Sequence, residues 1–434
     1  MSPTFTHHHY TRIPKYRLTF CIAALAACTS ILHAETLEEL TAEALRNNPE
    51  LRVLEASTAA ARGGVVTARA WQNPELSVAP GVKRTSDGGV SESSFHGTFE
   101  LNQLFEFPGK RQLRIALAER NVEISKLALE GLRFQLTSAV RKAFYEQLAA
   151  QRIVRLRREQ IISAKTFFEA ATKRAQGGYA SEFEAIRGQS DLINAKKAER
   201  AALGQIAEAR IAMNVLAGRA PSAPLEVSGD LDAAMPGSAS ADYIGLAMAR
   251  NPSLRTQELQ AEVAGLNLRK TRFGKRPDFA IGPQVEYTRG EQIYGVGVTV
   301  ALPFWNQFKG EVQTATAEQQ RALAEMERLR REIAGAVTRA SARADVARDQ
   351  LGLYSQDFLE KLKGFVAQAE KSYAQSATTL LIYLDAKRTY FDSMADYYQA
   401  LGSVAGSRAE LESAIGVPLS LQNTEPKTQP KSKK

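Results

Sequence analysis

Apolar and polar residues alternate with a period of two in two stretches of the chain. In the later stretch Phe279, Ile281 and Val285 share one face, while small or polar residues occupy the other. This period is typical of strands and not of helices. The same pattern occurs once earlier, on both sides of a polar, Gly-rich segment. The predicted β-hairpins cover 76–104 and 278–302, with a loop over 83–94 in the first.

A helical pattern without internal proline follows each predicted hairpin. It extends over 109–176 in the first case and 310–375 in the second. At 1.5 Å per residue, each helix is about 100 Å long. Globular domains rarely contain such helices, whereas coiled coils and envelope-spanning proteins do.

A tight turn ends each long helix and a second helix runs back. Gly178 lies in the first turn, and Ser181 and Thr379 are placed to act as N-caps of the returning helices. Gly218 and Gly416 are placed at their C-terminal ends. The sequence thus predicts two helical hairpins, at 109–217 and 310–416.

The order of parts occurs twice because the chain is internally duplicated. Asn48 and Asn251 both open an Asn-Pro helix start and lie 203 residues apart, as do Pro74 and Pro277. Such spacing indicates two copies of one supersecondary unit. The predicted divisions are repeat 1 at 35–218, a linker at 219–241, repeat 2 at 242–421 and a disordered tail at 422–434.

The hairpins are the best indication of function. One apolar face and one small or polar face are typical of membrane strands that surround a wet lumen. A β-sandwich edge packed on helices would show the same alternation, but helices of this length leave little for the hairpins to pack on. Open sheet edges are not tolerated in a bilayer, so the strands must close by oligomerisation. Three copies would give a twelve-stranded barrel.

The N-terminal segment reads as a secretory signal peptide over 1–34. A basic region precedes an apolar run, and Ala34 offers a small residue for cleavage. Leu25-Ala26-Ala27-Cys28 also fits a lipoprotein cleavage box, which would leave Cys28 lipidated. The eight residues after Cys28 reach at most about 28 Å. A 24-residue helix between them and the membrane measures about 36 Å, which favours cleavage after Ala34.

Charge and residue types exclude several other functions. The net charge is +9, but residues 1–34 and the Lys-rich tail supply much of it, so the body has no basic stripe for nucleic acid. Only His96 among five histidines, and neither cysteine, lies beyond residue 34. A high-affinity soft-metal site is therefore not expected. No phosphate loop, catalytic triad or dinucleotide motif is present, which predicts a protein that is not an enzyme and needs no cofactor.

These pieces, in this order and repeated, resemble the TolC-type outer-membrane efflux channels over 36–419. The resemblance rests on Asn-Pro-x-Leu at Asn48 and Asn251, on Gly109-Lys110-Arg111 after the first hairpin, and on the turn at 373–386. The segment from Leu302-Pro303-Phe304-Trp305 to Gly310 is most similar to the cation-efflux (CzcC-like) branch.

The resemblance implies a mainly α protein with a membrane β-barrel portion. It would be a homotrimer in the outer membrane, surrounded by lipid and extending into the periplasm. Its partners would be a periplasmic adaptor protein and an inner-membrane pump, and its cargo heavy-metal cations. Drug efflux or type I secretion through the same fold is an alternative. A periplasmic coiled-coil scaffold without a pore is another.

The resemblance also implies an acidic gate three and six positions beyond the Ser/Thr cap. Those positions hold Ile382 and Asp385 in the second copy, and Glu184 and Arg187 in the first. We expect Asp385 to be the gate acid, although a surface pair with Arg388 would equally explain it. Tyr383 either holds neighbouring helices closed through a hydrogen bond or simply packs in the core.

Overall fold

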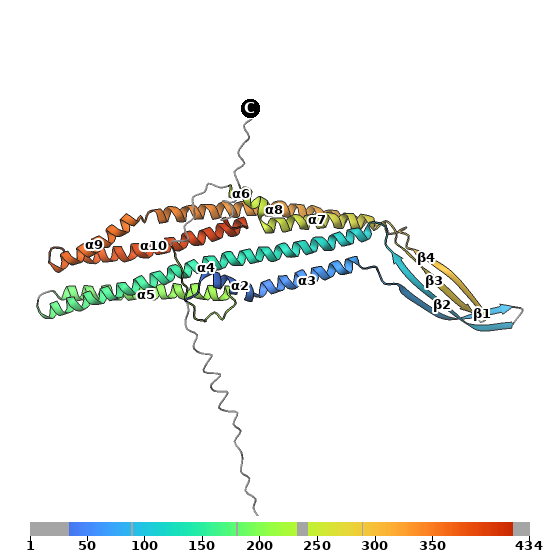
Figure 1. Cartoon of the computed structure of the whole chain (residues 1–434), viewed down its shortest axis with the longest axis horizontal. Helices are drawn as coiled ribbons and strands as arrows, with labels where there is room; N and C mark the ends of the chain where they lie inside the picture. The colour runs from blue at the N-terminus through green and yellow to red at the C-terminus, as the bar shows by residue number, and fades with distance from the viewer. Residues whose placement is uncertain (1–33, 88–89, 179–180, 232–241, 289, 420–434) are drawn as a thin grey trace, which may run out of the picture.

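The computed structural model describes residues 34–87, 90–178, 181–231, 242–288 and 290–419. The chain is elongated, with helices along most of its length and a sheet at one end (Figure 1). The first repeat contains α2 (Leu37–Asn47), α3 (Pro49–Arg69), β1 (Glu75–Asp87), β2 (Val90–Phe105), α4 (Lys110–Gln176) and α5 (Glu182–Leu216). The second contains α6 (Tyr243–Arg250), α7 (Pro252–Phe273), β3 (Phe279–Thr288), β4 (Glu291–Val300), α8 (Lys309–Gly352), α9 (Gln356–Ala374) and α10 (Leu380–Ile415).

The repeated Asn-Pro dipeptide starts a helix in both copies. The Asn48 side chain accepts a hydrogen bond from the Glu50 backbone N–H at 2.9 Å, and Asn251 accepts one from Ser253 at 2.9 Å. Each proline follows at the first helical position, where its missing N–H leaves no bond unmade. Local sequence alone therefore fixes both starts.

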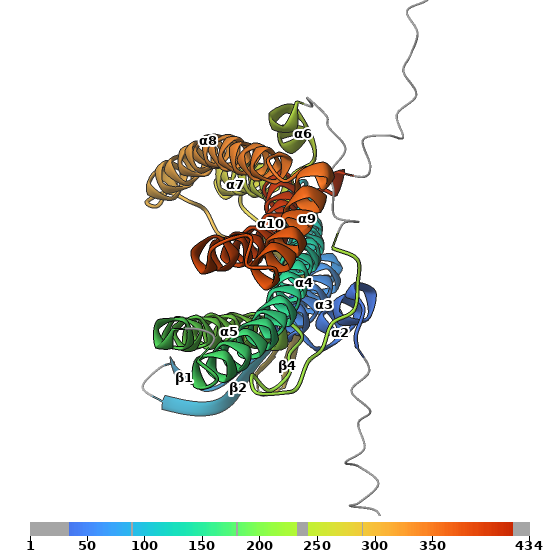
Figure 2. The same ribbon diagram turned by 90° about the vertical axis from the view of Figure 1, so that its left-hand side faces the viewer.

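The long helices form one curved layer. Helix α5 packs on α4, α4 packs on α10, and α10 packs on α8. Helices α3 and α7 continue the layer toward the sheet, α3 against α4 and α7 against both α4 and α8. Seen along its length, the layer is concave on one side, and α2 lies on the other (Figure 2).

Part of the predicted linker belongs to the core. Leu225, Val227 and Leu231 are buried against α4, together with Leu40 and Ala44 of α2. A backbone bridge joins Val227 to Glu35. The segment 219–231 thus acts as a strap across the outer face of the layer, while 232–241 lies outside the described residues.

The second long helix is interrupted, so the prediction of one continuous helix over 310–375 is wrong. Helix α8 ends at Gly352, and α9 begins after Ser355, whose hydroxyl accepts a hydrogen bond from the Phe358 N–H at 3.1 Å. A serine N-cap makes the new start favourable. Tyr354 fills the break, with its ring 6.2 Å from the ring of Tyr397 on α10.

Both hairpins join one antiparallel sheet in the order β1-β2-β3-β4. Strands β2 and β3 pair directly, with His96 opposite Thr288 and Phe105 opposite Phe279. The predicted loop over 83–94 is wrong, because β1 and β2 stay paired as far as Asp87 and Val90. Apart from Val90, the residues of that part of the ladder are polar, so no apolar alternation indicated strands there.

Several predictions from the sequence concern the chain ends. The signal peptide, Cys28 and the tail from residue 422 fall outside the described residues. Within the described residues, none of the helices combines the length and the apolar character needed to cross a bilayer.

Arg219 ties the strap to the N-terminal segment. Its guanidinium donates to Glu35 at 2.6 and 2.8 Å and to Glu43 at 2.7 Å. All three side chains are at most 24% exposed. Bonding to Arg219 holds the pKa of the Glu43 carboxyl below its usual value. Because the pKa is lowered by folding, ionised Glu43 stabilises the fold at any pH above the ordinary pKa of a glutamate. This stabilisation is lost as the pH falls through the lower pKa that Glu43 has in the folded protein.

We expect Arg219→Gln to lower the free energy of unfolding at pH 7 by about 2 kcal/mol, since charged hydrogen bonds are lost from a half-buried site. The midpoint temperature of thermal unfolding should fall accordingly. The difference from wild type should shrink as the pH falls below 4.5, the ordinary pKa of a glutamate. Circular dichroism at several pH values measures both effects. Arg255→Gln is the matched control, because its partner Glu258 forms an exposed pair. A difference in stability between wild type and Arg219→Gln that does not change with pH would contradict the stabilising role of the Arg219–Glu43 pair.

Candidate functional site

The helix turns at the end opposite the sheet form a compact tip. In the first turn Gly178 has a φ of +76°, a conformation that glycine adopts without strain. In the second, the Thr379 hydroxyl accepts a hydrogen bond from the Ile382 N–H at 3.4 Å. Ser181 occupies the equivalent N-cap position, but its hydroxyl makes no capping bond among the described residues. The two turns therefore occupy equivalent positions, but only the second has a side-chain capping bond among the described residues.

Aromatic rings fill the space between the two hairpins at the tip. The rings of Tyr373 and Tyr383 stack with centroids 5.0 Å apart and planes 5° from parallel. Phe167 of α4 contacts both, with centroids 5.9 and 5.5 Å away. Lys387 places its ammonium 4.6 Å from the Tyr383 ring and donates to the Ser163 hydroxyl at 2.5 Å. These five residues form what we call the tip cluster.

Besides the bond between Lys387 and Ser163, another hydrogen bond in this region links the two hairpins. The Tyr373 hydroxyl of α9 donates to the Glu184 carboxylate of α5 at 2.9 Å. Tyr383, which the sequence suggested for a bond between neighbouring helices, is 4% exposed, packs against the rings and makes a side-chain hydrogen bond with Glu370 of α9, within the second hairpin. The sequence analysis missed Tyr373, since its role depends on how the hairpins pack and leaves no local pattern.

Burial affects the protonation of the tip cluster. It raises the pKa of the Tyr383 hydroxyl, with Glu370 adding to the effect. It lowers the pKa of the Lys387 ammonium, which Glu370 and Asp191 partly oppose. Burial and the bond to Glu184 raise the pKa of Tyr373. Both tyrosines therefore stay protonated at neutral pH, and Tyr373 remains a donor.

Asp385 lies next to this cluster with its side chain exposed. The alternative of a pair with Arg388 is not found: Arg388 lies 3.6 Å from Asp392 instead. Across the described residues, Asp385 makes no ion pair or hydrogen bond. It is thus a free carboxylate near the end of the helical layer.

The sheet has two chemically different faces. Val78, Phe99, Val285 and Tyr294 lie side by side on one face and are all partly or fully exposed. The other face is polar: His96 lies 3.7 Å from Glu286 and 3.2 Å from the Thr288 hydroxyl. A sheet with its apolar face exposed is unstable in water unless another surface covers it.

A charged cavity of about 620 Å³ lies among α4, α5, α8 and α10. Lys142 donates to Glu410 at 2.6 Å, and Arg343 lies 3.5 Å from the same carboxylate. Burial raises the pKa of Glu146 nearby. The cavity therefore carries both charge signs. In the described part of the chain, no three His, Cys, Asp or Glu side chains are arranged to hold a metal ion.

The fold and these surfaces define a helical duct protein with a membrane sheet. The family profile described as outer membrane efflux protein matches residues 40–219 and 243–417. The chain belongs to the outer membrane efflux protein family. The prediction of an outer-membrane channel protein is confirmed, and the scaffold without a pore is not supported. The family is one of ducts and not of enzymes.

Named relatives agree with this assignment. The cobalt-zinc-cadmium resistance protein CzcC of Cupriavidus metallidurans is 24% identical over 383 residues, 88% of this chain and 90% of the relative. The nickel-cobalt-cadmium resistance protein NccC of Alcaligenes xylosoxydans xylosoxydans is 26% identical, over 77% of this chain and 76% of the relative. A crystal structure of CusC has a TM-score of 0.73 at 17% identity, covering 88% of this chain and 92% of that one.

We expect Tyr373→Phe to loosen the tip without unfolding the protein. A lost hydrogen bond of about 1 kcal/mol corresponds to roughly fivefold faster local opening. Hydrogen exchange of the amides at 376–384 measures this opening. Tyr390→Phe serves as the matched control, because the Tyr390 hydroxyl forms no hydrogen bond with the other described residues. Equal exchange in both variants would show that the Glu184 bond does not hold the tip.

Proposed function

We propose that this chain is one protomer of a trimeric outer-membrane exit duct that exports heavy-metal cations. The observation that carries the proposal is the four-stranded sheet with one apolar face and two free edges. Strands β1 and β4 each have a strand partner on one side only within the described residues. Backbone groups left unpaired in hydrocarbon cost several kcal/mol each, so β1 of one copy must pair with β4 of the next.

The helical layer supports the same closure. Its two lateral helices expose large apolar side chains, Ile193 and Val215 on α5, and Leu353 and Phe365 around α9, each at least 47% exposed. Apposing these edges in a ring would remove that surface from water, at about 25 cal/mol per Å² of apolar area. A closed ring of helices would then continue the barrel.

The cargo is inferred from the names of the relatives and from the lack of a metal-binding cluster among the described residues. Two relatives are named for resistance to cobalt, zinc, nickel or cadmium. The described residues hold no metal-binding cluster, and the charged cavity is of mixed sign. Selection of the metal would therefore occur in the pump, and the duct would be passive.

Asp385 would form the gate. Three copies of one exposed carboxylate around an axis repel one another and attract divalent cations, so they would set both the width and the charge of the opening. The bond between Tyr373 and Glu184 would hold the two hairpins of a protomer together around it.

The tip would also be the docking surface for a periplasmic adaptor protein and its pump. Phe183, Ile186, Leu381 and Ile382 lie in the first turns of α5 and α10, and each is at least 50% exposed. Apolar side chains at the end of a periplasmic duct need a protein partner to cover them.

We expect a strain that lacks this gene to become several-fold more susceptible to cobalt, zinc or cadmium salts and to regain resistance with the wild-type gene. Susceptibility to drugs and detergents should change little. Minimal inhibitory concentrations measure both. A change confined to drugs would instead support the alternative of drug efflux.

We expect the purified protein to have the mass of three chains and to show discrete openings in a planar bilayer. Asp385→Asn should conduct more and should be blocked by Cd²⁺ at least tenfold more weakly, a loss of about 1.4 kcal/mol. Glu360→Gln removes another exposed carboxylate, on α9, and should behave as wild type. If Cd²⁺ blocks Asp385→Asn as strongly as wild type, Asp385 is not the gate. If the purified protein shows no openings, the proposal of a duct is wrong.

A further inference from the structure

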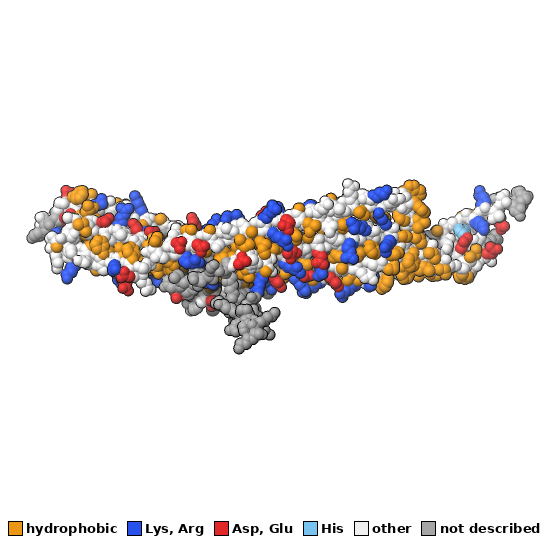
Figure 3. All heavy atoms as spheres, turned by 90° about the horizontal axis from the view of Figure 1, so that it is seen from above, with side chains coloured by type: hydrophobic (Ala, Val, Ile, Leu, Met, Phe, Trp, Pro, Cys, Tyr) orange, Lys and Arg blue, Asp and Glu red, His pale blue; other side chains and the backbone are white. Residues whose placement is uncertain are grey.

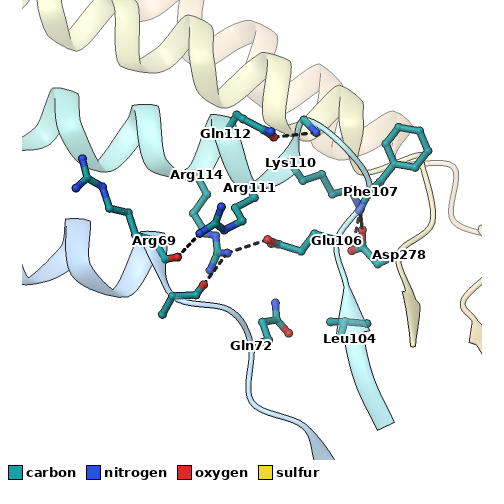
Figure 4. Close-up of polar contacts among 12 residues, drawn as sticks. Arg69, Gln72, Leu104, Glu106, Phe107, Lys110, Arg111, Gln112, Arg114 and Asp278 are labelled. Atoms are coloured by element: carbon teal, nitrogen blue, oxygen red, sulfur yellow. Dashed lines mark hydrogen bonds and ion pairs between the residues drawn. The ribbon is translucent and has the colours of Figure 1, made fainter. Parts of the chain in front are cut away.

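Positive charge collects where the helices meet the sheet. The segments 69–72, 105–114 and 269–278 contain nine Lys and Arg residues but only two carboxylates, Glu106 and Asp278. Glu106 pairs with Arg114 at 2.8 Å, and Asp278 pairs with Lys110 at 2.9 Å. Both acids are therefore already neutralised (Figure 4). Of the other seven cations, Arg69 alone has an ion-pair partner among the described residues, Glu119.

Aromatic rings lie beside this charge and continue the apolar face of the sheet. Trp71 contacts Phe105 edge-on at 6.3 Å, and Phe105 stacks on Phe279 at 5.5 Å. The Arg111 guanidinium lies 4.8 Å above the Trp71 ring. We call these four residues the junction ladder. Orange hydrophobic side chains crowd the same junction in Figure 3, with blue cations on the helical side.

Arg276 is held in a similar way. Its guanidinium lies 4.9 Å from the Phe107 ring and 4.6 Å from the Phe273 ring. The side chain is exposed, and none of the described residues forms an ion pair or side-chain hydrogen bond with it. Stacking on rings leaves the N–H groups of a guanidinium free to bind, and their planar fork matches a phosphate.

The face of the sheet and its edges have different partners. A second copy of the chain would pair with the edges β1 and β4, which carry the free backbone groups. Phe105 and Phe279 of the junction ladder lie on the inner strands β2 and β3, away from those edges. Its rings extend the apolar surface of Val78 and Phe99, which requires lipid. Aromatic girdles are typical of the level where strands leave the hydrocarbon for the headgroups.

We propose that the junction ladder and Arg276 form a headgroup site for anionic phospholipid in the leaflet that faces the helices. The rings would contact the upper acyl chains, and the Arg276 guanidinium, together with the N–H groups of Arg111 that are not bonded to the Arg69 carbonyl, would bind headgroup phosphates. This proposal rests on the outer-membrane duct of the proposed function and adds the lipid class and the residues that recognise it.

The chain provides its own reporter, because Trp71 and Trp305 are its only tryptophans. The mature Trp305→Phe trimer, reconstituted in phosphatidylcholine vesicles and excited at a wavelength that tyrosine does not absorb, leaves Trp71 as the single tryptophan to report. Brominated phosphatidylglycerol and brominated phosphatidylcholine are then compared at the same mole fraction. We expect the anionic lipid to quench Trp71 at least twofold more strongly.

Variants of the two arginines test the recognition. Arg111→Gln combined with Arg276→Gln should make the two lipids quench equally, and Arg276→Lys should keep part of the preference because it keeps the charge. Arg321→Gln, on α8, is the matched control and should leave the preference intact. Conductance recorded from the same preparations shows that each variant still forms a duct.

Three results would overturn the headgroup site while leaving the duct intact. Equal quenching by both lipids in the parent protein would show no selection of charge. Loss of the preference in millimolar inorganic phosphate would show a site for free anion. No quenching by either lipid in a conducting trimer would show that a second copy covers Trp71. Failure to insert or conduct would instead remove the proposed function, and this site with it.

Discussion

The rest of the structure depends on the two free edges of the four-stranded sheet. A β-strand in lipid must have every backbone N–H and C=O bonded, and a single chain bonds only the inner edges of β1 and β4. Closure with further copies, as in the proposed trimer, would therefore be a condition of residence in the membrane. Because the helices continue from the strands, closing the sheet also fixes which helices become neighbours.

Small residues allow the helical layer to be thin and tightly packed. A side chain at Gly402 of α10 would come within 2.8 Å of Ala149 on α4, and one at Gly188 of α5 would meet Phe167 at 3.0 Å. Close backbones bury much of each helix without large side chains, which explains the many buried alanines of α4 and α10. Long side chains can then lie at the tip and at the junction, where the layer would contact other surfaces.

The duplication, the strand faces and the capped helix starts could be predicted because each rests on local chemistry. Alternation defines a strand face, and an Asn-Pro pair caps a helix wherever it occurs. The interruption at Tyr354 could not, since glycine and serine also occur inside helices, and the contact of Tyr354 with Tyr397 depends on the packing of α10. The bond between Tyr373 and Glu184 was equally hidden, because it joins residues that only the packing of two hairpins brings together.

The two repeats differ in charge at the turns of the tip. At the position after the cap that holds Glu184 in the first repeat, the second holds Ile382, and Arg187 corresponds to Asp385. Glu184 accepts a bond from the other hairpin, whereas Asp385 remains free. Two identical repeats in a threefold assembly would present six equivalent turns. In the proposed trimer, turns that are held by this bond and turns that carry a free carboxylate would alternate around the axis, so opening would depend on a few bonds while the mouth of the duct stays negative.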